Sequence, residues 1–201
     1  MMAAIKFKMP WPSMQLDKIR PYFIVGVMAC VIFLWSVAPA NALENEQKRL
    51  IKAAYVYNIA KFTRWPDSTP NDLRSTPLSL CIAGEDELGL EGLRGKVVKK
   101  QPLEIHFIKS AYVPRNCHML YVSTSLLASK SINYLELIQS INNFPVLTLS
   151  EIPDFARQGG GFELYQSGGQ TRFIINLGVI RRAGLEVNPR LLNLAVVIGQ
   201  E

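Results

Sequence analysis

The sequence predicts an α/β domain: a single, mostly parallel β-sheet flanked by helices on both faces, with a C-terminal β-hairpin and a terminal helix. Two observations predict this class. Between residues 78 and 149, short apolar segments typical of buried strands alternate with segments of helical period, the order expected of parallel β-α-β units. Farther along, two strand-like segments surround the turn Gly168-Gly169, which predicts a hairpin.

The first 42 residues have the organisation of an export signal. A leader with four basic residues precedes the uncharged apolar run Tyr22–Val37, and small residues follow at Ala38–Ala42. This run has about 16 residues, fewer than the roughly 20 that a membrane-spanning helix needs. We therefore predict a signal peptide over residues 1–42, cleaved after Ala42, with no stable membrane insertion afterwards. An uncleaved membrane anchor is the alternative.

The predicted mature chain, residues 43–201, has the size of one ordinary domain. Removal of the signal leaves 18 basic and 15 acidic residues, a net charge of +3. The high isoelectric point of the whole chain is thus partly a property of the leader. No basic stripe with interleaved aromatic residues occurs in the sequence, so it does not indicate nucleic-acid binding.

Two cysteines, Cys81 and Cys117, remain after the signal. An even pair in an oxidising compartment predicts a disulfide, and each cysteine lies in or beside a strand-like segment. The bond would close a loop of about 36 residues and stabilise the fold by roughly 3–4 kcal/mol. The alternatives are two buried free thiols, or a metal site shared with His106 and His118, which lacks the usual paired ligand spacing.

An amphipathic helix is predicted over Asn45–Arg64 and stops before Pro66. Its predicted buried face consists of the recurring apolar residues Leu50, Ile51, Ala54, Tyr55, Ile59 and Phe62. The polar segment Asp67–Pro77 is predicted to be a loop.

The central segments then alternate between strand and helix. The predicted strands are Leu78–Ala83, Leu103–Ile108, Cys117–Ser123 and Val146–Leu149. The predicted helices between them are Glu85–Leu93 and Ser125–Ile141.

The C-terminal third is predicted to begin with the hairpin strands Phe162–Tyr165 and Thr171–Asn176. Gly184 is a predicted helix stop. A terminal helix is predicted from Asn188-Pro189, with the asparagine as N-cap and apolar residues as far as Ile198.

No catalytic or cofactor-binding motif is found. The glycines of Gly89–Val97 miss the spacing of a phosphate loop by one residue, and Gly159–Gly161 lacks the strand and helix of a dinucleotide-binding turn. There is no Gly-x-Ser-x-Gly motif, and both histidines lie in strand-like segments, where a hydrogen-bonded structural role is expected. We therefore predict no enzyme, no cofactor and no metal, but a protein that acts through binding.

Five residues are candidate contacts for a partner or ligand. Aromatic and basic residues gather toward the end of the first helix, and a further arginine at a sheet-edge position is suited to anions. The candidates are Tyr55, Lys61, Arg64, Trp65 and Arg172. The alternative is a packing role, in which Phe62 and Trp65 lie under the edge of the sheet.

Two blocks of sequence resemble the YfiR-like family. The first is Tyr55-x-x-Asn58-x-x-Lys61-Phe62-x-x-Trp65-Pro66. The second consists of Gly159-Gly160-Gly161-Phe162, Arg172-Phe173-Ile174-Ile175-Asn176-Leu177, Ala183-Gly184-Leu185 and Leu191-Leu192-Asn193-Leu194-Ala195. The two blocks follow in this order and spacing over nearly the whole mature chain, and the export signal precedes them.

The resemblance implies a small periplasmic α/β protein that forms a homodimer. It also implies a function: binding to the periplasmic domain of an inner-membrane diguanylate cyclase, which the protein represses, thereby lowering cyclic di-GMP and biofilm formation. Disulfide redox state is implied to affect such proteins. A periplasmic module that binds a small ligand through Arg64, Trp65 and Arg172, without a cyclase partner, is the alternative.

Overall fold

We describe the fold from a computed structural model, which defines residues 40–66, 77–129 and 132–199. The chain divides into two compact units, Met1–Glu44 and Asn45–Glu201. The predicted signal peptide lies almost entirely outside the described residues, and its predicted cleavage site falls within the first turn of helix α2. Most of the predicted polar loop, residues 67–76, is also outside the described part of the chain.

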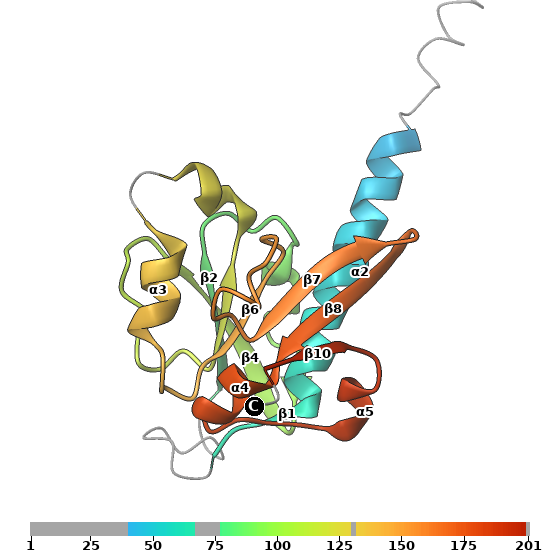
Figure 1. The fold of residues 1–201 in the computed structure, drawn as a ribbon. Coiled ribbons are helices and arrows are strands. Elements are labelled where there is room, and N and C mark those ends of the chain that lie inside the picture. Colours follow the sequence, from blue (N-terminus) through green and yellow to red (C-terminus); the bar gives the residue numbers. More distant parts are fainter. Residues whose placement is uncertain (1–39, 67–76, 130–131, 200–201) are drawn as a thin grey trace, which may run out of the picture. The chain divides into compact units, whose positions relative to one another are not determined.

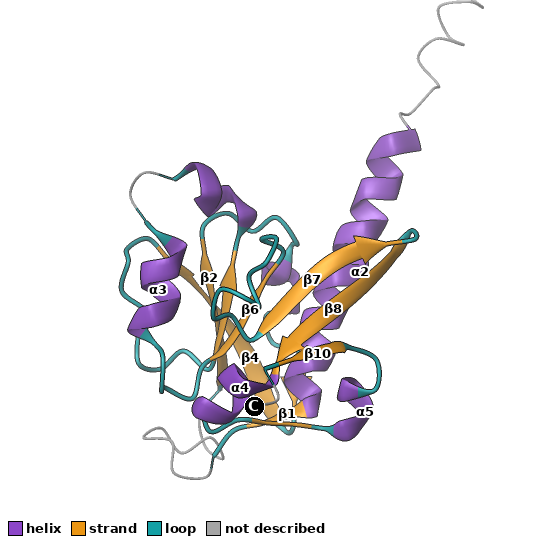
Figure 2. Cartoon of the chain, viewed as in Figure 1, coloured by secondary structure: helices purple, strands orange, loops and turns teal. Residues whose placement is uncertain are grey.

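The predicted mixed α/β class, with a mostly parallel sheet, is confirmed (Figures 1 and 2). The main sheet contains β2 (Leu78–Ala83), β3 (Val97–Val98), β4 (Gln101–Ile108), β5 (Met119–Val122), β6 (Leu147–Ser150), β7 (Phe162–Ser167), β8 (Gln170–Asn176) and β10 (Val196–Ile198). A separate two-stranded sheet pairs β1 (Thr63–Arg64) with β9 (Glu186–Val187). The helices are α2 (Ala40–Phe62), η2 (Leu90–Leu93), η3 (Thr124–Ala128), α3 (Tyr134–Ser140), α4 (Leu177–Arg182) and α5 (Pro189–Leu192).

The strand order of the main sheet is β10-β8-β7-β6-β5-β2-β4-β3. Five neighbouring strands, from β4 to β7, run parallel, while β3 and β8 join them antiparallel. The central strands β2, β5 and β6 are buried along their whole length, because helices cover both faces of the sheet.

Alternate side chains of each central strand enter two separate cores. In β2, Leu80 and Ile82 belong to the core under α2, while Cys81 and Ala83 belong to the core under α3. Figure 1 accordingly shows α2 and α3 on opposite sides of the strands, with the β7–β8 hairpin alongside α2. The two-residue repeat of a strand thus serves two helical layers.

Helix α2 buries only part of the predicted face: Ile59 is buried and Tyr55 is half-buried against the core, as predicted. Its buried side chains are mostly small or β-branched: Ala53, Val56, Ile59 and Ala60. Among the residues predicted to be buried, Leu50, Ile51 and Phe62 are 61%, 50% and 37% exposed. The small alanines let the helix approach the sheet closely, which outweighs the larger area that the leucine would bury.

Polar contacts fix this rotation of α2. Lys52 forms an ion pair with Glu151 at 2.5 Å, in the segment after β6, and both side chains are largely covered. The hydroxyl of Tyr57 donates to the carbonyl of Val97 in β3 at 2.8 Å. The two side chains flank the buried stripe of α2 and attach it to the sheet on either edge, so Leu50 and Ile51 turn outward.

The helix also ends earlier than predicted, at Phe62 instead of Arg64. Thr63 and Arg64 leave the helix because they pair antiparallel with Val187 and Glu186. The side chain of Thr63 is buried and donates to the carbonyl of Ile59 at 2.8 Å, closing the last turn.

The two predicted central helices are shorter than expected. Of Glu85–Leu93, only η2 is helical, and the carboxylate of Asp86 accepts from two of its main-chain N–H groups at 2.7 and 2.9 Å. The predicted helix Ser125–Ile141 is replaced by η3 and α3. Two separate N-caps cause the division, since Ser123 caps η3 and Asn133 caps α3.

The predicted hairpin is confirmed: β7 and β8 pair antiparallel around Gly168 and Gly169, whose φ angles of 58° and 75° suit a tight hairpin turn. Gly184, with φ of 68°, follows the end of α4 as predicted. The terminal helix is only the single turn α5, capped by Asn188. Residues predicted to extend it form β10 instead, because their β-branched side chains pair in parallel with β8.

The predicted disulfide between Cys81 and Cys117 is present, with the Cα atoms 5.9 Å apart. The free-thiol and metal-ligand alternatives for these two cysteines are therefore wrong in this structure. Cys81 lies in β2 and Cys117 lies two residues before β5. The bond therefore attaches the crossover between β4 and β5 to the α3 side of the central strand.

Removal of this disulfide is expected to lower the melting temperature. The double substitution Cys81→Ala and Cys117→Ala should reduce it by about 10 °C, because a closed loop of 36 residues is worth roughly 3–4 kcal/mol in a domain of this size. Differential scanning calorimetry measures the shift. As a control, reductant should destabilise the parent protein and leave the double variant unchanged. Equal melting temperatures for parent and variant in oxidising buffer would show that the bond contributes no stability.

Candidate functional site

Trp65 is a core residue and not an exposed contact. Its side chain is 7% exposed, and its indole N–H donates to the carbonyl of His118 at 3.1 Å. The ammonium of Lys99 lies 5.9 Å from the indole ring centre and also donates to the carbonyl of Thr63. Trp65 therefore connects the end of α2 to the start of β5, the packing role that the sequence left open.

Lys61 and Arg64 are exposed at the same end of α2. The ammonium of Lys61 lies 5.4 Å from the ring centre of Tyr57, and the guanidinium of Arg64 is 3.5 Å from the carboxylate of Glu186. Burial lowers the pKa of Lys99, and the charge of Arg64 lowers it further. The end of α2 thus carries several cations, which complement the negative end of the helix dipole.

Tyr55 and Arg172 are placed separately. Tyr55 is half-buried, and its ring centre lies 6.0 Å from that of Phe173 on β8. Arg172 directly precedes Phe173 in that strand but is exposed, so its side chain leaves the sheet on the other face. The structure therefore does not bring Arg172 together with Arg64, which lies in the separate two-stranded sheet at the foot of α2 (Figure 1).

His118 is a buried histidine with a structural role, as expected. Its Nδ1 accepts from the main-chain N–H of Ser79 at 2.9 Å, so a neutral ring carries its hydrogen on Nε2. Burial lowers the pKa of His118 to about 4. Its carbonyl also accepts from Leu147 at 2.9 Å. One residue therefore links β2, β6 and Trp65.

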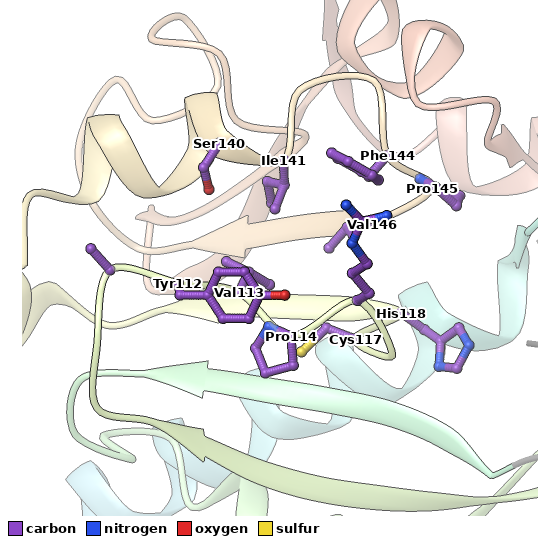
Figure 3. A pocket seen from close by; sticks show the side chains of 12 residues that line it. Tyr112, Val113, Pro114, Cys117, His118, Ser140, Ile141, Phe144, Pro145 and Val146 are labelled. Atoms are coloured by element: carbon purple, nitrogen blue, oxygen red, sulfur yellow. The ribbon is translucent and has the colours of Figure 1, made fainter. Parts of the chain in front are cut away.

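A cavity of about 270 Å³ lies on the α3 side of the sheet, where β5 and β6 begin (Figure 3). Two segments line it: residues 111–118 of the crossover before β5, and residues 140–146 after α3. The walls are mainly apolar, and Cys117 of the disulfide forms part of them. Figure 3 shows the ring of His118 turned away from Tyr112 and Phe144.

The sequence did not predict this cavity. The two lining segments are about 30 residues apart in the chain, and neither has a recognisable motif. The available signal was modest: each segment contains a proline next to a residue that the fold leaves exposed, Arg115 after Pro114 and Phe144 before Pro145.

Within the described ranges, no group of three or more histidine, cysteine, aspartate or glutamate side chains is placed to hold a metal ion. In the same part of the chain, no helix has both the length and the apolar composition needed to span a bilayer.

The fold and these features define a small α/β domain with a mostly parallel sheet, a buried disulfide and an apolar cavity. A family model described as YfiR/HmsC-like matches residues 49–196, and the chain belongs to this family. The match confirms the resemblance seen in the sequence. Family membership suggests a periplasmic regulator of diguanylate cyclases, since members of the family are regulators and not enzymes.

The buried His118 predicts a loss of stability in mild acid. The unfolded histidine takes up a proton below about pH 6.5, whereas the folded ring does so only near pH 4, so stability is complete above pH 6.5 and falls between these values. The free energy of unfolding should decrease by about 2 kcal/mol across this range beyond the change in a His118→Asn variant. Urea unfolding at several pH values measures it.

The asparagine of this variant retains an acceptor for the N–H of Ser79 but does not titrate. His106→Asn is the matched control, because His106 lies on β4 outside both cores. The acid-induced loss that His118 causes should remain in His106→Asn, because this variant keeps His118. If His118→Asn keeps the full acid sensitivity, His118 is not the responsible group.

Proposed function

We propose that this protein is a periplasmic regulator that binds the periplasmic domain of an inner-membrane diguanylate cyclase and represses the enzyme, lowering cyclic di-GMP. The observation that carries the proposal is the family match over residues 49–196, which reaches from α2 to β10. The export signal predicted over residues 1–42 supports the compartment. The mature domain is then residues 43–201.

The exposed side of α2 is the surface best suited to the partner. We call Leu50, Ile51, Ala54 and Phe62 the α2 outer face; all four are exposed, and their spacing places them along one side of the helix. Single exposed apolar residues are common, but a row of them marks a protein interface.

Cations border this surface. Lys61 and Arg64 lie at the end of α2, so an apolar centre has a charged rim, an arrangement typical of protein interfaces. Of the five predicted contact residues, these two and Arg172 are exposed enough to reach a partner directly. Tyr55 and Trp65 would act by holding α2 against the sheet.

Repression requires that the protein bind the inactive conformation of the cyclase more tightly than the active one. The size of the effect is set by this difference in affinity, and a shift from 1% to 99% inactive enzyme needs a difference of about 10⁴-fold. We also propose that the protein is a homodimer. The alternative of a ligand site formed by Arg64, Trp65 and Arg172 has no support from the geometry, since Trp65 is buried and Arg172 lies apart.

Charge placed on the α2 outer face should weaken binding to the cyclase. In protein purified from the periplasm, Leu50→Glu is expected to raise the Kd for the periplasmic domain of the cyclase at least tenfold, because a buried leucine contributes about 1.5–3 kcal/mol. Isothermal titration calorimetry under oxidising and reducing conditions measures this. Leu127→Glu is the matched control, since Leu127 is 57% exposed on η3.

Sedimentation velocity of the same variants separates loss of the partner from loss of the dimer. The proposal expects Leu50→Glu to keep its oligomeric state while its affinity for the cyclase falls. Failure of the parent protein to bind the cyclase domain under both redox conditions would reject the proposed function.

A further inference from the structure

The cavity beside the disulfide contains an unpaired cation. Among the described residues, Arg115 has no ion-pair or hydrogen-bond partner; its guanidinium carbon lies 5.7 Å from the ring centre of Phe144. Besides Arg115, the lining contains no lysine, aspartate or glutamate, and His118 is neutral at pH 7 because burial lowers its pKa to about 4. The cavity therefore presents one positive charge and no acidic side chain.

Two aromatic side chains at the cavity are not covered by the fold. Tyr112 is 64% exposed and Phe144 is 42% exposed, although both line the same concave surface. Figure 3 shows them on opposite walls, one from each lining segment. Below them, the walls are formed by the buried side chains of Val113, Ile141 and Val146.

The cavity is preformed. The disulfide fixes Cys117 to β2, the main-chain N–H of Cys117 donates to the carbonyl of Pro114 at 3.0 Å, and Val113 is anchored in the core under α3. Pro145 restricts the opposite segment. A ligand that enters this space thus loses little free energy to ordering of the protein.

We propose that this cavity binds a small aromatic carboxylate. A flat apolar ring would lie against Phe144 and Tyr112, and the carboxylate would accept hydrogen bonds from the Arg115 guanidinium, whose planar fork matches two carboxylate oxygens. A volume of about 270 Å³ is slightly smaller than the roughly 300–1,000 Å³ of most ligand pockets, which selects a ligand of one or two rings.

The main-chain carbonyls at the end of α3 repel the negative charge of the ligand's carboxylate only weakly. That of Gln139 accepts from Asn142 at 3.1 Å, and that of Ile141 accepts from Phe144 at 3.0 Å, so part of the negative end of this short helix is already engaged. A phosphate or other multiply charged ligand is not favoured, because one arginine faces a mainly apolar wall. This inference does not depend on the cyclase partner.

Binding of two matched probes tests the proposal. 2-Naphthoate carries the carboxylate, whereas 2-naphthamide has nearly the same shape without the charge. The intact periplasmic protein should bind the acid with a Kd below about 1 mM and the amide at least tenfold more weakly, as measured by calorimetry. NMR shifts caused by the acid should map to residues 111–118 and 140–146.

Two variants test which side chains bind the carboxylate and the ring of the probe. Arg115→Gln should weaken binding of the acid at least tenfold and leave the amide nearly unchanged, while Phe144→Ala should weaken both probes. Arg172→Gln, an exposed arginine on β8, is the matched control and should bind the acid like the parent protein. All three residues are exposed, so the variants should fold, and calorimetric melting verifies this.

The proposal is overturned if neither probe binds at about 5 mM, or if the acid binds Arg115→Gln as tightly as it binds the parent protein. If the parent binds neither probe but Phe144→Ala loses affinity for the cyclase domain, the cavity receives a side chain of a protein partner and not a small carboxylate.

Discussion

The burial of strand β2 on both faces is the constraint on which the rest of the structure depends. Its side chains alternate between the core under α2 and the core under α3, so each helical layer is positioned by every second residue of one short strand. The disulfide adds a covalent link at Cys81 on the α3 side. The same strand thus determines where α2 lies, and hence which residues of α2 face outward. It also determines where the crossover that forms the cavity lies.

The two proposed binding surfaces therefore lie on opposite layers. The α2 outer face exists because alanines, and not the larger Leu50 and Ile51, pack against the sheet. The cavity exists because Cys117 holds the crossover close to β2, beside the segment that follows α3. A ligand in the cavity and a protein on α2 would lie on opposite sides of the same central strands, so occupancy of one can affect the other only through the packing between them.

Local signals in the sequence predicted those elements that local chemistry decides. Strand β2 is apolar except for Ser79, and the hairpin contains two glycines with positive φ, so both elements were located correctly. The rotation of α2 was not predictable from periodicity, because an ion pair of Lys52 with Glu151 and small alanines outweigh the area of Leu50. Strand β10 and the cavity escaped prediction for a related reason: each requires segments distant in sequence to meet.

We propose that this family member acts in the periplasm by binding and repressing a membrane diguanylate cyclase. Co-purification of the native protein from membranes of its own cell, followed by mass spectrometry of the captured proteins, tests the claim most directly. We expect a chain that begins at Leu43 and is recovered together with a diguanylate cyclase that has a periplasmic domain. Recovery of the protein from the cytosol with its first 42 residues intact, and with no cyclase attached, would contradict it.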